Sequence, residues 1–441
     1  MTSKSRWIDH SFGEVVRMVS GGTPRRETPA YWNGSLDWYS AKDLKSFLLK
    51  GSQDRITEQG ASNGTRKVPK GTPLMLVRGM TLLKEVPVGI TTSEASFNQD
   101  VRALLSDAIV GEYLGYLLKS RERTLLSMVD QAGHGTGRLS TDRINELVLH
   151  FPECKKEQVA IVSVLSMWDL CISQLTDLIA AKLGFKQGLM QQLLTGKKRI
   201  TSRTHHRTPG PLPGDSPDDS VVSLEVEFGI TGKSFQEGIP AVSTCPPGWT
   251  QHSFRQVFKA VERPAELSDQ VVYQLVTAKR YRGGIVPREQ LRGEQIKTKT
   301  QFFVAAGDFL ISKRQIIHGA CGMVPASLDG AVVSNEYACL QPSSQLDPGF
   351  LNYLTHARYF QQTCFHASVG VALEKMIFRL DQWLKHLVNL PPLSEQRAIA
   401  HCLSTMDREI LLLARQRRLL KEQKKGLMQK LLTGEVRVHQ K

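Results

Sequence analysis

Two stretches of this sequence are near-copies of each other, and they decide how the chain is organised. EQVAIVSVLSMWDLCISQL begins at Glu157, and EQRAIAHCLSTMDREILLL begins at Glu395, an offset of 238 residues (395 − 157). At the same offset, FKQGLMQQLLTGKKRI from Phe185 matches QKKGLMQKLLTGEVRV from Gln423. The register holds without a gap through both stretches, so the chain is an internal duplication.

A shorter repeat opens each half of the chain. The pattern W-x-x-H-S-F begins at Trp7 and recurs at Trp249, an offset of 242 residues (249 − 7). It precedes the long repeat in both halves, which makes the short match credible. Each half therefore has a shared opening, a region that diverges between the halves, and a shared closing segment.

The closing segments are predicted to be long helices. Their apolar residues recur at alternating spacings of four and three, the heptad pattern of helices that pack as a coiled coil. These residues are Ile161, Leu165, Trp168, Ile172, Leu175, Ile179, Leu189 and Leu193 in the first copy and Ile399, Leu403, Met406, Ile410, Leu413, Leu420, Leu427 and Leu431 in the second, with Lys182, Lys186, Arg417 and Lys424 as interruptions. Prolines precede each segment, and Gly196 and Gly434 mark the ends. The alternative is two core helices of one globular domain.

The two divergent regions are predicted to be mixed α/β domains. The expected strands are Thr72–Val77, Val86–Thr91, Phe302–Ala306, Phe309–Ser312 and Val332–Val333, and the expected helices are Gly111–Leu118 and Pro348–Phe360. A stretch rich in Pro, Gly, Asp and Ser after Thr201 is predicted to be a linker. The expected boundaries are 1–151 for the first domain, 152–200 for the first long helix, 201–247 for the linker, 248–390 for the second domain and 391–441 for the second long helix.

Charge and cysteine usage narrow the class of protein. The chain has 57 Lys and Arg residues against 42 Asp and Glu, a formal net charge of +15. This surplus favours a polyanionic partner, with nucleic acid first and an anionic membrane second. The seven cysteines form no C-x-x-C pair, which argues against a disulfide framework or a zinc site. No apolar run approaches the roughly 18 residues of a membrane span, so we expect a cytoplasmic protein with no membrane partner.

The search for catalytic motifs is negative. The sequence contains no G-x-x-x-x-G-K-[ST] phosphate loop and no Asn/Asp-Pro-Pro-aromatic tetrapeptide of the kind found in adenine methyltransferases. No Cys or His cluster has the spacing of a metal site. We therefore predict a recognition protein with no catalytic residue, no metal ligand and no cofactor in this chain.

Basic side chains cluster in both divergent regions, where aromatic residues accompany them. Lys and Arg neutralise phosphates whatever the base sequence, and Arg also hydrogen-bonds base edges. The candidate DNA-binding residues are Arg25, Arg26, Lys42, Arg66, Lys67, Arg78 and Arg138 in the first region, and Lys279, Arg280, Arg282, Arg288, Lys297, Lys299, Lys313 and Arg314 in the second. For each residue alone, a solvated surface charge is the competing interpretation.

With these motifs in place, the chain resembles the specificity subunit of type I restriction–modification enzymes over nearly its full length. The resemblance rests on the G-L-M-Q-x-L-L-T-G helix ends, the P-P-L-S-E-Q start at Pro391, and the W-x-x-H-S-F openings. G-T-P-R from Gly22, Y-W-N-G from Tyr31 and N-Q-D-V from Asn98 are also similar to the family's target-recognition opening. The departures are modest: the first helix start, F-P-E-C-K-K-E from Phe151, is one residue longer than the second, and the linker is long.

The resemblance implies a fold, a function and partners. Two target-recognition domains would be separated by two antiparallel helices in a pseudo-two-fold arrangement, each domain reading one half of a split, asymmetric DNA target. The helices would dock two methyltransferase subunits, which bind S-adenosylmethionine and methylate adenine N6, and restriction subunits would join for cleavage. The implied docking residues are Leu165, Trp168, Leu175, Leu189, Leu193, Leu403, Met406, Leu413, Leu427 and Leu431.

Two interpretations from other classes stay open at this point. One is a self-contained methyltransferase or nuclease, against which the missing cofactor and metal motifs count. The other is a structural coiled-coil adaptor without sequence-specific DNA reading, against which the net charge and the paired basic regions count.

Overall fold

The computed structural model describes residues 6–132, 135–200, 224, 227, 240 and 244–438. The chain divides into two compact units. The first unit comprises Met1–Ser173 and Arg418–Lys441, and the second comprises Gln174–Arg417. Each unit thus contains one divergent region, the first part of the long helix that follows it, and the last part of the other long helix. Most of the expected linker, 201–247, lies outside the described residues.

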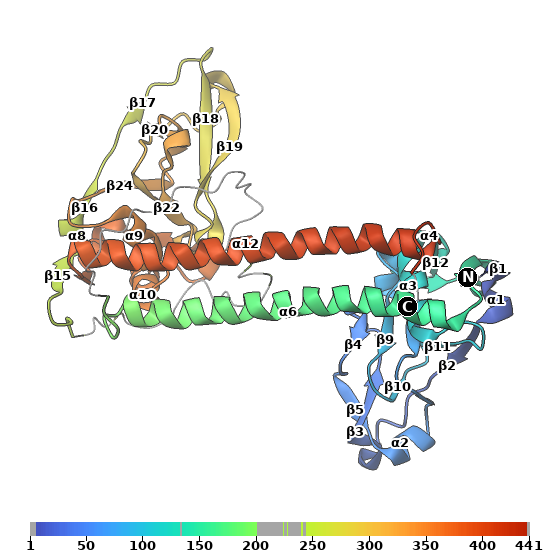
Figure 1. The fold of residues 1–441 in the computed structure, drawn as a ribbon. Coiled ribbons are helices and arrows are strands. Elements are labelled where there is room, and N and C mark those ends of the chain that lie inside the picture. Colours follow the sequence, from blue (N-terminus) through green and yellow to red (C-terminus); the bar gives the residue numbers. More distant parts are fainter. Residues whose placement is uncertain are drawn as a thin grey trace. The chain divides into compact units, whose positions relative to one another are not determined.

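The first unit is built from small sheets and short helices (Figure 1). Its strands are β1 (Trp7–Ser11), β2 (Arg17–Ser20), β3 (Trp32–Tyr39), β4 (Leu48–Leu49), β5 (Asp54–Ile56), β6 (Lys67–Val68), β7 (Pro73–Leu76), β8 (Arg78–Gly79), β9 (Val88–Thr91), β10 (Ala95–Phe97), β11 (Val101–Leu105), β12 (Val129–Ala132), β13 (Thr136–Leu139) and β14 (Val148–Pro152). Its short helices are α1 (Phe12–Val15), α2 (Glu58–Ser62), α3 (Gly111–Ser120), α4 (Glu122–Ser127) and α5 (Thr141–Asn145), with the 3-10 turns η1 (Pro29–Tyr31) and η2 (Met80–Leu83).

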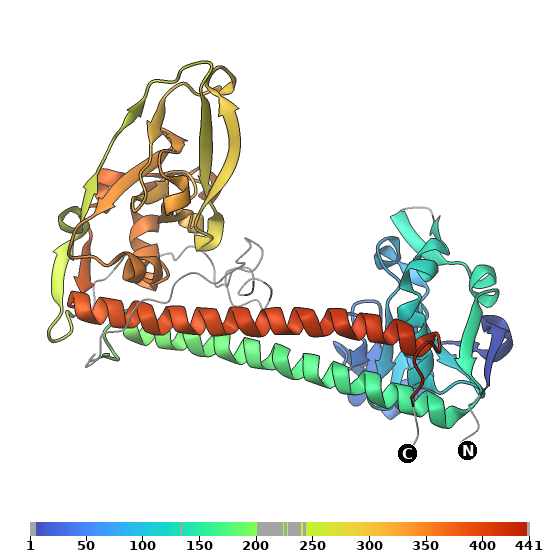
Figure 2. The ribbon, with the colours of Figure 1, turned by 45° about the horizontal axis from the view of Figure 1, so that its top comes forward.

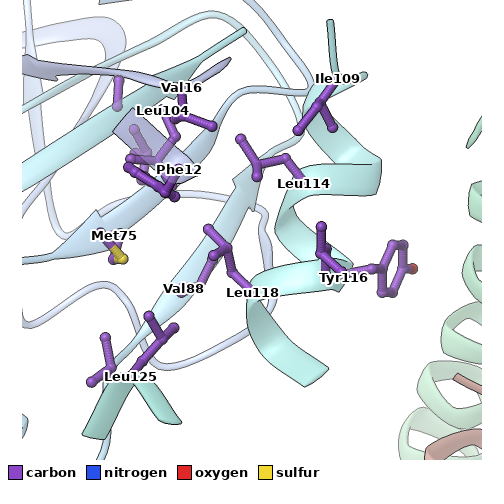
Figure 3. Close-up of a cluster of buried hydrophobic side chains, with 14 of the residues drawn as sticks. Phe12, Val16, Met75, Val88, Leu104, Ile109, Leu114, Tyr116, Leu118 and Leu125 are labelled. Atoms are coloured by element: carbon purple, nitrogen blue, oxygen red, sulfur yellow. The ribbon is translucent and has the colours of Figure 1, made fainter. Parts of the chain in front are cut away.

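The strands of the first unit form four sheets, and its buried side chains form one large core and a smaller cluster around Trp38. The sheet orders are β1-β14, β5-β3-β10-β6, β2-β11-β7-β9-β4 and β12-β13-β8. Figure 3 shows α3 directing Leu114 and Leu118 toward Met75 of β7 and Val88 of β9, and all four side chains are buried. Tyr116 lies on the opposite side of α3 from these leucines. One face of α3 therefore closes the core, and its other face is free to contact the long helices of the same unit.

The second unit has the same ingredients, and its two large sheets keep the strand order of the first unit apart from one edge strand. Its strands are β15 (Thr250–Ser253), β16 (Phe258–Ala260), β17 (Pro264–Ala265), β18 (Val272–Ala278), β19 (Ile285–Arg292), β20 (Gln301–Phe303), β21 (Phe309–Ser312), β22 (Cys321–Met323), β23 (Val332–Ser334), β24 (Tyr337–Pro342), β25 (Ser368–Val369), β26 (Ile377–Phe378) and β27 (Leu387–Leu390). Its short helices are α8 (Phe254–Val257), α9 (Pro348–Leu354), α10 (Arg358–His366) and α11 (Leu380–Trp383), with the 3-10 turns η5 (Arg280–Arg282), η6 (Gly293–Gln295), η7 (Ile316–His318), η8 (Ala326–Leu328) and η9 (Leu373–Lys375).

The sheets of the second unit are ordered β15-β27, β16-β24-β21-β22, β17-β20-β23-β18-β19 and β25-β26. The β18–β19 pair forms a long antiparallel hairpin (Figures 1 and 2). An aromatic cluster fills the core, where the ring of Phe254 stacks on Trp383 with centroids 4.1 Å apart. Both divergent regions combine strands with helices, which confirms the predicted mixed α/β class.

The shared segments form the two long helices, α6 (Lys155–Leu193) and α12 (Leu393–Leu432). In the first unit, Leu431 near the end of α12 joins the core that holds Ile161 near the start of α6. In the second unit, Leu193 at the end of α6 joins the core that holds Ile399 near the start of α12. The helices therefore run antiparallel within each unit, as the resemblance implied.

Glycines end both long helices. Gly196 has φ +69° and Gly434 has φ +75°, a left-handed backbone that glycine adopts without a steric penalty. This confirms the helix ends that the sequence marked.

By length and composition alone, α6 is also the one helix among the described residues that is long and apolar enough to cross a membrane. Core helices of other proteins meet the same criterion, and α6 also places Lys186 and Asp169 in ion pairs within the protein.

Candidate nucleic-acid interface and its helical supports

A buried glutamate anchors the first domain to the beginning of α6. The Glu157 carboxylate accepts hydrogen bonds from Arg437 Nε at 2.6 Å and Nη2 at 2.9 Å, and from Trp7 Nε1 at 3.4 Å. The Arg437 guanidinium also lies over the Trp7 ring, 5.5 Å from its centroid. The opening of the domain, the start of α6 and the segment after α12 thus meet at one carboxylate. Charge-assisted, paired hydrogen bonds of this kind are among the stronger polar contacts in proteins.

The second unit repeats this contact with the equivalent residues. Glu395 accepts from Arg199 Nε at 2.6 Å and Nη2 at 2.7 Å, and from Trp249 Nε1 at 3.3 Å. The hydrogen bonds to Glu395 raise the pKa of Arg199, whose guanidinium lies 5.7 Å from the centre of the Trp249 ring. The W-x-x-H-S-F openings and the E-Q helix starts are therefore two parts of one anchor. Sequence analysis did not identify Arg199 and Arg437 as its third part, although both lie in the long repeat.

The glutamine of each E-Q pair fixes the end of a nearby loop. Gln158 accepts from the Val110 backbone N–H at 2.7 Å, directly before α3, and donates to the Pro152 carbonyl at 2.8 Å. Gln396 accepts from the Asp347 N–H at 2.8 Å, directly before α9, and donates to the Pro391 carbonyl at 2.9 Å. The side chain of each glutamine therefore satisfies backbone groups at a helix start, which would otherwise lack partners.

A second repeated contact lies further along each helix pair. In the first unit, Asp169 binds Lys424 Nζ at 2.5 Å and the Tyr116 hydroxyl at 2.6 Å. Burial, together with the hydrogen bond to Asp169, raises the pKa of Tyr116, so its hydroxyl stays protonated and donates. Lys424 interrupts the heptad pattern because its ammonium group pairs with Asp169.

The second unit contains the matching set. Asp407 binds Lys186 Nζ at 2.7 Å and the Tyr353 hydroxyl at 2.6 Å. Lys186, another interruption of the heptad pattern, is almost fully buried. The two aspartates stand at the same position of the long repeat, so each long helix is attached to its own domain by the same chemistry.

The predicted docking residues lie mainly on the inward side of the helices. Leu165, Leu193, Leu403 and Leu431 are buried in the cores of their units. The other six are partly buried: Trp168, Leu175, Leu189, Met406, Leu413 and Leu427. Apolar side chains that are exposed lie elsewhere on the helices: Val159, Met167, Leu170, Leu178 and Phe185 on α6, and Leu412 and Leu419 on α12. The heptad spacing therefore identified the buried and partly buried residues on the inward side of the helices, and it did not identify these exposed apolar residues.

Several candidate cations of the first domain already have acidic partners. Lys67 Nζ contacts Glu58 at 2.9 Å and Glu94 at 3.3 Å, and hydrogen bonds to these two carboxylates raise its pKa. Arg26 pairs with Asp54 at 3.1 Å, and its guanidinium lies 3.9 Å from the centre of the Trp32 ring. Lys42 reaches the same aspartate at 3.8 Å.

Most candidate cations of the second domain are also engaged. Arg314 forms a two-point ion pair with Glu336, Arg280 pairs with Glu374 at 3.3 Å, and Arg288 pairs with its neighbour Glu289 at 2.8 Å. Three more members of this group donate to backbone carbonyls: Arg282 to Thr355, Lys299 to Gly293 and Lys313 to Asn335.

The other predicted cations are exposed: Arg25, Arg66, Arg78, Arg138, Lys279 and Lys297. Across the part of the chain that the structure describes, none of their side chains forms an ion pair. Arg78 and Arg138 stand directly opposite each other on the paired strands β8 and β13. The structure therefore brings together two of the residues that the sequence proposed separately. Among the described residues there is also no group of three or more His, Cys, Asp or Glu side chains placed to hold a metal ion.

The chain matches the model of a family described as the type I restriction modification DNA specificity domain, over residues 4–182 and 248–422. The chain belongs to this family. The two matched ranges contain both divergent regions and most of both long helices.

Two relatives illustrate the range of sequence similarity. The specificity subunit of the Escherichia coli type I restriction enzymes EcoR124I and EcoR124II is 26% identical over 180 residues, which cover 40% of this chain and 44% of that protein. The MjaVIII specificity subunit of Methanocaldococcus jannaschii is 25% identical over 334 residues, 74% of this chain and 70% of that protein. The match with the Escherichia coli protein thus spans less than half of that relative's length.

Solved structures share the fold. A chain from a study of complex assembly and conformational transition in the type I restriction–modification system aligns with a TM-score of 0.57 and 15% identity, covering 98% of this chain and all of that one. The S subunit from M. genitalium aligns with a TM-score of 0.52 and 13% identity, covering 98% and 97% of the two chains. At these identities the likeness concerns the fold.

Proposed function

We propose that this chain is a non-catalytic specificity subunit that reads a bipartite, asymmetric DNA target. The observation that carries the proposal is the recurrence of the Trp–Glu–Arg anchor and the Tyr–Asp–Lys contact beneath two domains that share a strand order but differ in sequence. Equivalent supports under domains of different sequence suit two reading surfaces with different half-sites. The net charge of +15 and the exposed arginines provide the attraction to phosphates that such reading needs.

The same proposal gives the long helices a second role, the docking of two methyltransferase subunits. The exposed side chains of Met167, Leu170 and Phe185 support this role, because large apolar groups on a helix surface favour a protein partner. The partners would bind S-adenosylmethionine and methylate adenine N6 in the cytoplasm, and restriction subunits would join the complex for cleavage. The predicted docking residues, which lie mainly on the inward side of the helices, then act indirectly, because they hold the exposed apolar side chains in place.

Domain exchange followed by methylome sequencing tests the bipartite reading. Residues 7–150 are replaced by the equivalent region of another family member, and methylated adenines are mapped in cells that carry the hybrid and its partners. We expect one half of the methylated motif to change while the other half stays. A matched hybrid that replaces 250–388 should change the complementary half. If either exchange alters both halves together, the two domains are not independent readers.

A structural adaptor is the second candidate, favoured by the same exposed apolar residues of α6. It differs from a DNA reader in its response to salt. Each phosphate contact contributes about −0.9 to the slope of log K against log salt concentration, so a reader with several contacts per domain should show a slope with a magnitude well above about 4. A nearly flat response of the purified complex on duplex DNA would favour the adaptor. Transfer of labelled methyl groups by the pure chain alone would instead identify an enzyme.

A further inference from the structure

One small element of the first domain exposes two large apolar side chains in a fixed position. The 3-10 turn η2 spans Met80–Leu83, and its Met80 and Leu83 side chains are 72% and 44% exposed. Leu82, between them, is fully buried. In a 3-10 helix, residues three apart lie above one another, so Met80 and Leu83 share the outward face.

The turn is held tightly against the neighbouring strand. Gly137 of β13 packs so closely on Leu82 that a Cβ atom at Gly137 would lie 2.8 Å from the Leu82 Cβ. Gly79, directly before the turn, is the cross-strand partner of Gly137. Met80 and Leu83 are therefore presented by a packed element of the domain. The strands involved, β8, β12 and β13, form one sheet of the first unit.

Positive charge accumulates beside this turn. Arg78 and Arg138 face each other across the β8–β13 pair, an arrangement of like charges that destabilises a sheet unless an anion binds there. Asp130 stands opposite Arg138 on β12, but its carboxylate pairs with Arg143 at 3.5 Å. The exposed Lys84 follows the turn and is itself followed by the exposed Glu85. The balance of this surface is positive.

We propose that Met80 and Leu83 form an apolar wedge that enters duplex DNA at one base step, with Arg78 and Arg138 on the adjacent phosphates. Proteins that insert apolar side chains between base pairs unstack the step and recover the cost through the contacts that follow. Duplex DNA offers both chemistries. Its stacked bases suit the apolar side chains of Met80 and Leu83, and its anionic backbone suits the paired arginines. This inference rests on the proposed function and assigns a position-specific role to residues outside the predicted set of cations.

Fluorescence of 2-aminopurine tests the wedge. Once the methylated motif is known, duplexes carry 2-aminopurine at successive positions of the first domain's half-site, leaving out the methylated adenine. The full chain is used in complex with its methyltransferase partners. We expect fluorescence to rise several-fold at one step on binding of the wild-type complex. Met80→Ala and Met80→Gln should return it toward the level of free duplex, and Met80→Ala should weaken binding about tenfold through the lost apolar contact.

Val148→Ala is the matched control, because Val148 is an exposed apolar residue of the same unit on a different sheet. It should leave both fluorescence and affinity unchanged. Specific binding with undisturbed stacking at every position, or an equal signal from Met80→Ala, would overturn the wedge while leaving DNA reading intact. Failure of the wild-type complex to bind specific DNA would instead overturn the proposed function. Loss of methyltransferase co-purification in Met80→Ala would reassign the surface to a protein partner.

Discussion

The two units of this chain are alike where each domain meets the long helices and unlike where the domains face outward. Glu157 and Glu395 bind their arginines at the same 2.6 Å and their tryptophans at 3.4 and 3.3 Å. The large sheets above them share a strand order and differ in sequence and at their edges, where β4 extends one sheet of the first unit and β17 extends one sheet of the second. Similarity has persisted where side chains bind another part of the same chain, and divergence has accumulated where no internal contact dictates the residue.

The cations of the two domains differ in the same outward region. In the first domain Arg78 and Arg138 oppose each other with no ion-pair partner among the described residues. In the second domain Arg280 and Arg314 are neutralised by Glu374 and Glu336. If both domains read DNA, Arg78 and Arg138 present their charge directly, whereas Arg280 and Arg314 must exchange carboxylate partners for phosphates.

Breaking a long helix should give the largest effect. It also tests whether α6 and α12 contribute equally to stability and to methyltransferase docking. Leu175 and Leu413 occupy the same repeat position on α6 and α12. Leu175→Pro or Leu413→Pro should each cost about 3 kcal/mol or more, because proline removes a hydrogen bond and clashes with the preceding turn. We expect loss of helical circular dichroism and of methyltransferase co-purification. Leu175→Met and Leu413→Met serve as controls, and a proline variant that still co-purifies normally would refute a docking role for that helix.

Removing an anchor carboxylate should give the next largest effect, and a similar one in each unit. Glu157→Gln or Glu395→Gln weakens the two-point pair with arginine while the site stays buried, at a cost of about 2 kcal/mol. Hydrogen exchange should accelerate at the start of α6 in the first variant and at the start of α12 in the second. Glu153→Gln, at an exposed position, is the control. Strongly unequal losses of protection would show that the two anchors contribute different free energies despite their matching distances.

The strongest sequence predictions came from long, regular patterns. Heptad spacing identified α6 and α12, and glycines identified their ends. The helix expected over Pro348–Phe360 was wrong in one respect: the structure has α9 and α10 separated at Thr355–Ala357, where Ala357 adopts an extended backbone with ψ 133° before the second helix. No Gly or Pro marks this break, because it is set by how the two helices pack in the core.

The candidate site was predictable by residue type but not by pairing. Sequence clustering found Arg78, Arg138 and Arg314 together with many other cations. Only strand register shows that the first two oppose each other, and only the fold places Glu336 against the third. The sequence analysis did not identify Met80 and Leu83 as exposed. Leu82 lies between them and is buried, and all three residues are apolar, so the sequence does not show which of them face solvent.

Acidic pH should destabilise the second unit more than the first. Desolvation, together with the charges of Arg282 and Lys186, holds the pKa of His356 well below its ordinary value, and desolvation and His366 lower the pKa of His386. As pH falls below the ordinary histidine pKa of about 6.5, the unfolded chain binds protons that the folded second unit does not. Its stability should decline by up to about 1.4 kcal/mol per pH unit for each histidine.

His356 lies between α9 and α10, and the first unit has no histidine in α3 or α4, the two consecutive helices at the same place in its chain order. Hydrogen exchange between pH 7.5 and 5.5 should therefore show earlier opening in the second unit. His356→Gln should reduce the difference, because glutamine does not titrate. Parallel loss of protection in both units would mean that other groups dominate the acid response.

The smallest effect concerns single phosphate contacts and sharpens the contrast between the two cationic surfaces. Arg78→Gln should reduce the magnitude of the salt slope by about 1, since one free cation would no longer displace a counterion. Arg314→Gln should change the slope by less, because Glu336 already neutralises that guanidinium at 2.5 Å. Exposed ion pairs contribute only about 0–1 kcal/mol, so DNA could still capture Arg314 by releasing Glu336. Glu336→Gln distinguishes the two cases by binding titrations from low to high salt: it should steepen the slope if Arg314 lies at the DNA, and leave it unchanged if the pair lies away from it.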